Sequence, residues 1–190
     1  MINVNFAPNE NLKDAWLAVK LLITPASRIK DGEATVLQML QNLTGVRHEH
    51  IFLLLSARGA IFTLLTALQL PKGSEVLVQG FTCEAVVLPI IAAKVKPVYV
   101  DIEEESWSMD LSSLHKKYSR KSRVLILQHT FGMVPVFRKK ILKYAASKKI
   151  FVVEDLAHGF HPQIFDNKSN HSGAFLFSFG RSKLISSLYG

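Results

Sequence analysis

The stretch VLILQHTFGMVPVFRKKILKYAASKKIFVVED, residues 124–155, decides the fold because it contains a complete strand–helix–strand unit. It begins with the apolar run VLILQH (124–129) and ends with a second one, IFVVED (150–155). Between the two runs, residues 137–148 carry apolar side chains at helical spacing. Continuous runs of Val, Ile and Leu joined by a helix are typical of parallel strands that are buried on both faces. This unit therefore predicts a layered α/β domain.

The same alternation of strands and helices continues on both sides of this unit. Further strands are predicted at residues 50–56 (HIFLLLS), 75–79 (EVLVQ), 96–102 (KPVYVDI) and 174–179 (AFLFSF). Further helices are predicted near residues 10–23, 32–44, 59–70, 82–93 and 110–119, the second of them ending at Gly45. We expect a three-layer α/β/α fold with a mainly parallel sheet. In this reading residues 1–45 form an N-terminal helical segment and residues 46–190 form the large domain.

The composition fits a soluble globular protein of one large domain. The 190 residues include 48% hydrophobic and 20% charged residues, which are ordinary values. A single cysteine, Cys83, excludes an internal disulfide and fits a reducing compartment. The first residues lack the pattern of a signal peptide, and no apolar run approaches the ~20 residues of a spanning helix. We therefore expect a cytoplasmic protein without a membrane span.

The formal net charge of +8 raises the possibility of a nucleic-acid partner. The basic residues concentrate in HKKYSRKSR (115–123) and FRKKILKYAASKK (137–149). The second stretch has apolar residues at helical spacing, so its lysines are expected on a solvated helix face. No nucleic-acid-binding motif accompanies the charge. We expect no nucleic-acid partner, while an attraction for an anionic substrate stays open.

Polar residues follow the predicted strands at the points where the strands end. These residues are Ser56, Thr82–Cys83, His129, Asp155 and Ser178–Lys183. In open α/β sheets, ligands bind beyond the carboxyl ends of the strands. If the strands are parallel, these groups gather along one edge and outline a site.

Asp155 and Lys183 are the strongest candidates for chemistry. Asp155 either ends its strand and caps the next segment, or lies in a low-dielectric pocket where it needs a cationic or hydrogen-bonding partner. A pyridinium nitrogen is such a partner, because a protonated ring can absorb electrons from a substrate carbanion. Lys183 lies 28 positions after Asp155, behind an apolar strand and a turn at Gly180. It is either a surface residue or an amine in a cleft, where it could form a Schiff base.

The segment SARGA (56–60) connects a predicted strand to a predicted helix. Ser56 can serve as an ordinary helix cap. Alternatively, the helix start can hold an anion, with Arg58 adding charge and Gly59 allowing close approach of the backbone. The segment is not a P-loop, since the GxxxxGK[ST] pattern is missing.

The cysteine and the histidines offer weaker alternatives. Cys83 is most simply a small buried apolar residue, and a cysteine nucleophile would need His129 as its base. His129, His158 and His161 come from different segments without a second cysteine or a His-x-x-x-His pair. We therefore expect no metal site.

A series of short motifs occurs in a characteristic order. They are SARGA (56–60), KGSEV (72–76), QGFTCEA (79–85), KPVYVDI (96–102), QHTFG (128–132), VVEDLAH (152–158) and FSFGRSK (177–183). This order resembles the DegT/DnrJ-type sugar aminotransferases of the fold-type-I pyridoxal-phosphate (PLP) superfamily. The resemblance runs from about residue 5 to the last residue.

The resemblance implies roles for individual residues. Lys183 would bind PLP through a Schiff base and then move protons at the substrate carbon. Asp155 would pair with the pyridine nitrogen of the cofactor. His158 would lie near the phenolic oxygen, where many relatives carry glutamine.

The resemblance also implies the rest of the cofactor site. Arg58 and Gly59 would face the cofactor phosphate, and Ser178 would be a further phosphate ligand. Cys83 occupies the position at which many relatives stack an aromatic residue on the cofactor ring. A thiol offers a smaller contact area there. The stretch VPVFRKK (134–140) replaces the family's PADMD-like segment.

The activity implied by the resemblance is transfer of an amino group to a nucleotide-linked keto-sugar, with glutamate as the amino donor, in amino-sugar and surface-polysaccharide biosynthesis. Family members form homodimers and continue past the lysine with a glycine-rich strand and a small C-terminal domain, so the chain resembles a truncated member. One alternative is a catalytically incompetent fragment of such an enzyme. Another is a PLP-dependent sugar dehydratase of the same family, in which a histidine typically replaces the lysine.

Overall fold

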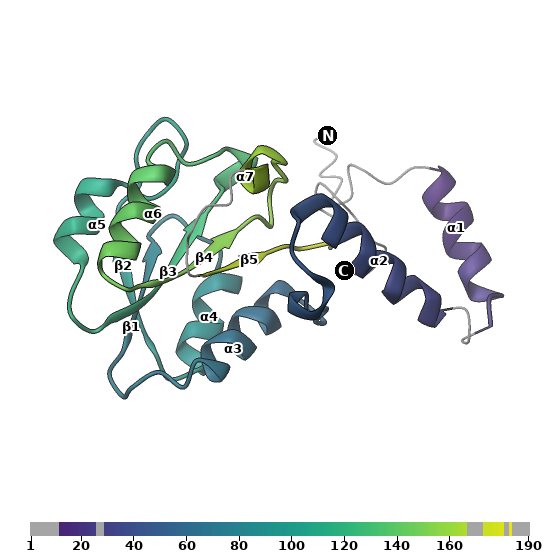
Figure 1. Ribbon diagram of the computed structural model, residues 1–190, viewed down its shortest axis with the longest axis horizontal. Coiled ribbons are helices and arrows are strands. Elements are labelled where there is room, and N and C mark those ends of the chain that lie inside the picture. Colours follow the sequence, from purple (N-terminus) through teal and green to yellow (C-terminus); the bar gives the residue numbers. More distant parts are fainter. Residues whose placement is uncertain (1–11, 26–28, 167–172, 181–182, 184–190) are drawn as a thin grey trace, which may run out of the picture. The chain divides into compact units, whose positions relative to one another are not determined.

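A computed structural model describes residues 12–25, 29–166, 173–180 and 183 (Figure 1). The chain divides into two compact units. The helical unit comprises Met1–Leu54, His161–Ser169 and Phe179–Gly190. The sheet unit comprises Leu55–Phe160 and Asn170–Ser178. The domain boundary expected after residue 45 stays a prediction.

The helical unit contains α1 (Leu12–Leu22), α2 (Ile29–Thr44), the short 3₁₀ helix η2 (His48–His50) and α7 (Gln163–Asp166). The predicted end of α2 at Gly45 is confirmed. Gly45 has a φ of 70°, and its N–H donates to the carbonyl of Gln41 at 2.8 Å. Glycine adopts this left-handed backbone without the steric cost of a Cβ atom, so it ends the helix. Within the described residues, no helix combines the length and the apolar character that crossing a membrane requires.

The sheet unit is built on five parallel strands (Figure 1). The strands are β1 (Glu75–Gln79), β2 (Lys96–Val100), β3 (Ser122–Gln128), β4 (Phe151–Asp155) and β5 (Gly173–Leu176). Their order in the sheet is β2-β1-β3-β4-β5, and every neighbouring pair is parallel. The predicted parallel α/β sheet is therefore confirmed.

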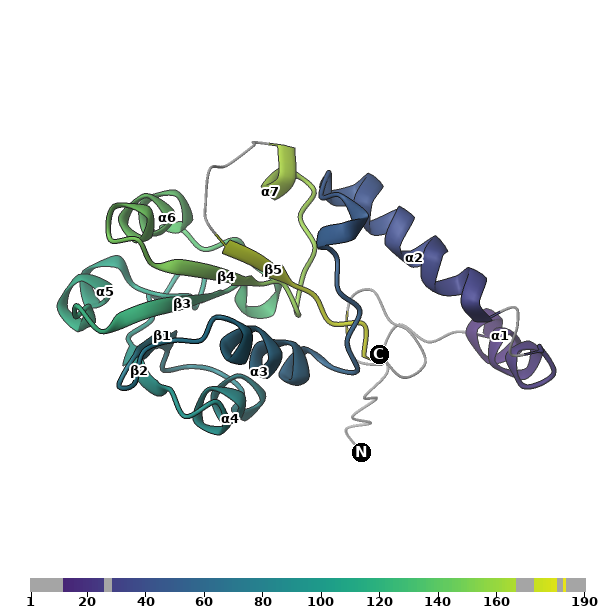
Figure 2. The ribbon, with the colours of Figure 1, turned by 60° about the horizontal axis from the view of Figure 1, so that its bottom comes forward.

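Helices cover both faces of this sheet, as the three-layer prediction requires (Figure 2). The helices α3 (Ala57–Ala67) and α4 (Glu84–Ala92) pack on one face, where Ile61 and Ile90 contact the strand residues Val78 and Ile126. The helices α5 (Leu111–Lys117) and α6 (Arg138–Ser147) pack on the other, where Leu114 and Ile141 join Leu77, Leu125 and Leu127. Alternation along each strand sends successive side chains to the α3/α4 face and to the α5/α6 face in turn.

The strand predicted at HIFLLLS (50–56) is wrong. Residues 48–50 form η2, and the following residues up to Leu55 adopt no regular structure. Leu55 is 97% exposed and Phe52 is 77% exposed. A strand requires a hydrogen-bonding neighbour, and the five-stranded order contains none for this segment. An apolar run indicates a preference for burial but does not identify a strand.

The strand order reverses between β1 and β3. From β1 the chain proceeds first to β2 on one side, and then returns to place β3, β4 and β5 on the other side. Such a reversal leaves a crevice at the carboxyl ends of the two strands where the order changes, because the loops that leave them diverge. The carboxyl ends of β1 and β3 therefore mark the expected ligand-binding edge.

Candidate active site

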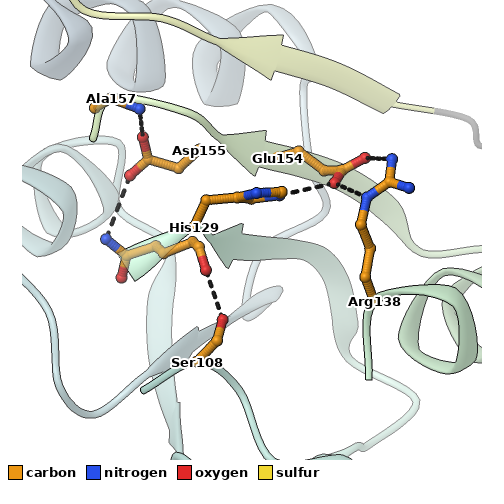
Figure 3. Close-up of polar contacts among 7 residues, drawn as sticks. Ser108, His129, Arg138, Glu154, Asp155 and Ala157 are labelled. Carbon is orange, nitrogen blue, oxygen red and sulfur yellow. Dashed lines mark hydrogen bonds and ion pairs between the residues drawn. The ribbon is translucent and has the colours of Figure 1, made fainter. Parts of the chain in front are cut away.

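Asp155 is the last residue of β4 and lies at the carboxyl edge of the sheet. Its side chain belongs to the α3/α4 face, because Val153, two residues earlier, packs there. Asp155 is only 6% exposed. One carboxylate oxygen, Oδ1, accepts a hydrogen bond from the backbone N–H of Ala157 at 3.0 Å, as Figure 3 shows. The carboxylate is therefore buried and fixed in orientation.

Gln128 provides the second contact to Asp155 and was not identified from the sequence. It ends β3 directly opposite Asp155 in the strand register. Its Nε2 donates to Asp155 Oδ2 at 3.3 Å, and its backbone carbonyl accepts a hydrogen bond from Ser108 Oγ at 2.5 Å. Its buried Oε1 has no hydrogen-bond partner among the residues that the structure describes. The sequence signal that could have identified Gln128 is its position, as a polar residue at the end of an apolar run.

A second polar cluster lies on the α5/α6 face and is centred on Glu154 (Figure 3). Glu154 and His129 have side chains with 0% exposure, and His129 Nε2 lies 3.1 Å from Glu154 Oε2. Arg138, the first residue of α6, makes a bidentate pair with the same carboxylate, at 2.6 Å from Nε and 2.8 Å from Nη2. The backbone N–H of His129 also donates to the carbonyl of Asp155 at 3.0 Å. This cluster joins β3, β4 and α6.

The two partners of Glu154 determine its charge state. Burial by itself raises the pKa of the Glu154 carboxyl group. The hydrogen bonds and charge supplied by His129 and Arg138 outweigh this effect and lower the pKa to about 2. Glu154 is therefore ionised at neutral pH inside the protein. Bidentate contact with a guanidinium is the strong form of such a pair.

His129 lies at the same edge of the sheet as Asp155, as expected, but the two side chains are on opposite faces. His129 follows β3 as expected, but its ring is buried on the α5/α6 face against Glu154. Cys83, by contrast, is exposed at the start of α4 on the opposite face. A buried ring that is bound to Glu154 cannot serve an exposed thiol as a base, which argues against a cysteine nucleophile.

The start of α3 shows the capping geometry that was one of the two interpretations of SARGA. Ser56 Oγ accepts a hydrogen bond from the N–H of Gly59 at 3.1 Å. Ser56 does not follow a strand, contrary to expectation, but it still precedes the helix. Arg58 is exposed in the first turn. The second interpretation, that Arg58 and Gly59 face a phosphate, stays a prediction.

Cys83 is exposed, so the prediction that it is a small buried residue is wrong. It is the N-cap of α4, and its sulfur accepts a long hydrogen bond from the N–H of Ala85 at 3.5 Å. Helices that follow parallel strands begin at the carboxyl edge of the sheet, where their first residues face outward. The position next to a ligand edge therefore explains the exposure of the thiol.

His158 is exposed in the loop that follows β4. Its ring lies parallel to that of Phe131, with 6.3 Å between the centroids and 6° between the planes. The next residues along the chain, Gly132 and Gly159, bring their backbones close together. A Cβ atom at Gly159 would lie 2.6 Å from the Cα atom of Gly132. The two loops can approach only because both residues are glycine.

The remaining predicted site residues follow β5. Ser178 is partly buried and belongs to the sheet unit. Lys183 is partly buried and belongs to the helical unit, and its backbone N–H donates to the carbonyl of Gly180 at 2.9 Å. The turn expected at Gly180 is thus present. The convergence of Lys183 and Asp155 on one cofactor stays a prediction.

Residues 36–190 match the DegT/DnrJ/EryC1/StrS aminotransferase family, and the chain belongs to this family. It is 31% identical over 121 residues to the GDP-perosamine synthase of Escherichia coli O157:H7, covering 64% of this chain and 31% of that protein. It is 26% identical over 165 residues to a UDP-N-acetyl-3-dehydro-alpha-D-glucosamine 3-aminotransferase of Acidithiobacillus ferrooxidans, covering 86% of this chain and 43% of that protein. The chain therefore spans less than half the length of these relatives.

Solved structures show the same fold. The crystal structure of AtS13 from Actinomadura melliaura superposes with a TM-score of 0.59 at 26% identity, covering 69% of this chain and 37% of that one. The structure of NtdA from Bacillus subtilis with bound cofactor PMP gives a TM-score of 0.52 at 26% identity, covering 55% of this chain and 24% of that one. The parallel sheet with helices on both faces is thus a fold shared with these proteins.

Proposed function

We propose that this chain is the cofactor-binding part of a PLP-dependent aminotransferase that acts on a nucleotide-linked keto-sugar. The observation that carries the proposal is Asp155, a buried carboxylate held at the carboxyl edge of a parallel sheet. Family membership supports the reaction class. Both relatives described above are named for sugar-nucleotide chemistry, which supports the substrate class.

The geometry around Asp155 fits the pyridine nitrogen of PLP. The N–H of Ala157 and the amide of Gln128 each donate to one carboxylate oxygen, so the carboxylate is oriented at the edge where a protonated ring nitrogen would bind. A low-dielectric surrounding strengthens such an ion pair. PLP, when bound, supplies an electron sink for the carbanion formed at the substrate carbon. The protein would contribute the Asp155 carboxylate, which is already oriented before the cofactor binds.

Other residues would complete the cofactor site. Lys183 would anchor PLP and transfer protons at the reacting carbon, and His158 would donate toward the phenolic oxygen. Arg58, Gly59 and Ser178 would bind the phosphate at the start of α3. Because Ser56 already accepts the Gly59 N–H, the phosphate would either displace that contact or use other groups of the first turn.

The further parts of the proposal concern the substrates and the assembly. Glutamate is the proposed amino donor, and a homodimer in the cytoplasm is the proposed form of the full-length enzyme. The formal charge of +8 would favour encounter with a diphosphate-linked sugar. The product would be an amino sugar for surface polysaccharides or related compounds.

The proposal is tested by adding PLP to the 190-residue chain and recording the absorbance spectrum. We expect a shifted band that is lost in Lys183→Ala and kept in Lys143→Ala, which removes an exposed lysine from α6. Reduction with borohydride followed by peptide mass analysis should place the label on Lys183. A label on other lysines, or a spectrum equal in both variants, would reject the proposal.

A further inference from the structure

Three aromatic side chains form a cluster at the carboxyl edge of the sheet. Phe81 follows β1, Trp107 lies between β2 and α5, and Phe131 follows β3. The ring of Phe81 lies 5.9 Å from that of Trp107 and 6.0 Å from that of Phe131, in tilted and edge-on orientations. The three side chains are 47%, 46% and 65% exposed, respectively. We call this cluster the aromatic platform.

A single buried residue, Gln79, ties together the three loops that carry the platform. Its side chain is 0% exposed at the end of β1. Its Nε2 lies within hydrogen-bonding distance of three acceptors, the carbonyl of Phe81 at 2.7 Å, Thr130 Oγ1 at 2.9 Å and the carbonyl of Trp107 at 3.2 Å. The amide has two hydrogens, so two of these acceptors share one of them. Thr130 directly precedes Phe131. The Gln79 amide therefore connects the three loops that carry the rings, so their relative positions are fixed by a shared buried contact.

The backbone of the platform carries strain. Trp107 and Phe131 both have a φ of 53°. This left-handed conformation is unfavourable for bulky residues and persists only where the surrounding structure enforces it. Strain of this kind gathers at ligand-binding positions. Here it turns large rings toward solvent at a cost in stability.

The platform also lies where the topology predicts a ligand. Phe81 and Phe131 follow β1 and β3, the two strands between which the strand order reverses. The ring of Phe131 is in turn parallel to that of His158, three residues after Asp155. The platform is thus continuous with the proposed cofactor site.

The size of the platform limits what can cover it. An aromatic side chain offers about 150–250 Å², so three half-exposed rings present roughly 250–400 Å². A stable protein interface requires about 800 Å² from each partner. The platform alone is too small for a second copy of the chain, but it suits one planar heterocycle.

We propose that the aromatic platform is the subsite for the nucleobase of the nucleotide-linked substrate, with Phe131 as its main stacking residue and Gln79 as its positioning residue. The inference rests on the proposed function for the nature of the substrate. A base stacks on aromatic rings with little preference for its identity. The platform would therefore supply affinity for a nucleotide and leave the sugar and the phosphates to other groups.

The test uses the fluorescence of Trp107. The chain has two tryptophans, and the second, Trp16, lies in α1. In a Trp16→Phe background, titration with UDP or GDP should quench Trp107 to saturation, while pyrophosphate, which lacks a base, should not. A parallel titration of N-acetyltryptophanamide corrects for light absorbed by the nucleotide.

Variants assign the effect to the platform. Phe131→Leu keeps an apolar side chain and the same backbone strain but removes the ring, so nucleotide affinity should fall roughly 5- to 100-fold. Phe62→Leu makes the same change in α3 at a phenylalanine that is 42% exposed, and it should leave the affinity unchanged. Gln79→Glu removes the donor amide, so it should weaken nucleotide binding and shift the Trp107 emission. Circular dichroism checks that each variant is folded.

The outcomes separate this inference from the proposed function. Absence of saturable quenching, or equal affinity in Phe131→Leu and Phe62→Leu, would overturn the subsite. Loss of a dimer in Phe131→Leu without any quenching in the parent would also overturn it and would assign the platform to a subunit interface. PLP labelling of Lys183 without nucleotide binding would reject the nucleobase subsite but not the proposed function. Nucleotide binding without PLP labelling would reject the proposed function but not the nucleotide-binding role of the aromatic platform.

Discussion

Glu154 and Asp155 are neighbours in the sequence, but their side chains lie on opposite faces of the sheet and have different partners. Glu154 lies on the α5/α6 face, ionised and enclosed by His129 and Arg138. Asp155 lies on the α3/α4 face, where the backbone N–H of Ala157 and the side-chain amide of Gln128 donate to its carboxylate. A carboxylate with its full set of charged partners is a structural element. The proposed role of Asp155 as the partner of a cationic ring nitrogen stays a prediction.

The strongest test of this comparison is Glu154→Gln. The change removes the negative charge that compensates the partly buried guanidinium of Arg138, whose side chain is 13% exposed. We expect the free energy of unfolding to fall by about 3 kcal/mol at neutral pH. Urea unfolding followed by circular dichroism measures it. The control is Glu105→Gln, an exposed position where the change should stay within about 0.5 kcal/mol.

The same variant has a defined pH dependence. The pKa of Glu154 falls from 4.5 to about 2 on folding, so the ionised form is the one that the folded state prefers. Its contribution to stability is complete above pH 4.5 and disappears as the pH falls through about 2. The stability difference between the parent and Glu154→Gln should therefore narrow over this range. A difference that stays constant with pH would show that the charge is not the cause.

The next effect in size concerns the loops that carry His158 and Phe131. Gly159→Ala places a Cβ atom 2.6 Å from the Cα atom of Gly132, so one loop must move. We expect a loss of about 1–3 kcal/mol in thermal or urea unfolding. Gly32→Ala, in α2, meets no atom within 4 Å and should be neutral or stabilising. Equal stability of the two variants would contradict the close crossing of the loops.

The smallest expected effect on stability is that of Asp155→Asn. The N–H of Ala157 keeps an oxygen partner, and the amide of Gln128 can turn so that its Oε1 accepts from the new side chain. We expect a change of about 1 kcal/mol or less in unfolding. Affinity for PLP should nevertheless fall about tenfold or more, because the charge opposite the ring nitrogen is gone. A large loss of stability with unchanged PLP affinity would make Asp155 structural, as Glu154 is.

Much of the fold could be predicted because its signals are local. The strands β1, β3 and β4 each contain a continuous apolar run, as buried parallel strands require, and Gly45 ends α2 at the expected position. The run HIFLLLS has the same composition and yet forms no strand. Whether an apolar run becomes a strand depends on a neighbouring strand, which composition does not encode.

The candidate site was predictable to a lesser extent. Asp155 was identified because it ends an apolar strand at the edge of the sheet where ligands bind. Glu154 and Gln128 were missed because each looks like the ordinary end of a strand. Their partners come from residues 16 to 27 positions away, so the pairing exists only after the strands align.

The sequence by itself determined the alternation of strands and helices and the family to which the chain belongs, because apolar runs and ordered motifs are properties of the linear chain. Only the tertiary structure decided which face each carboxylate occupies and which groups reach it. It also brought Phe81, Trp107 and Phe131 together through Gln79. The reason is that side-chain direction alternates along a strand, while contacts between strands depend on their order and register in the sheet.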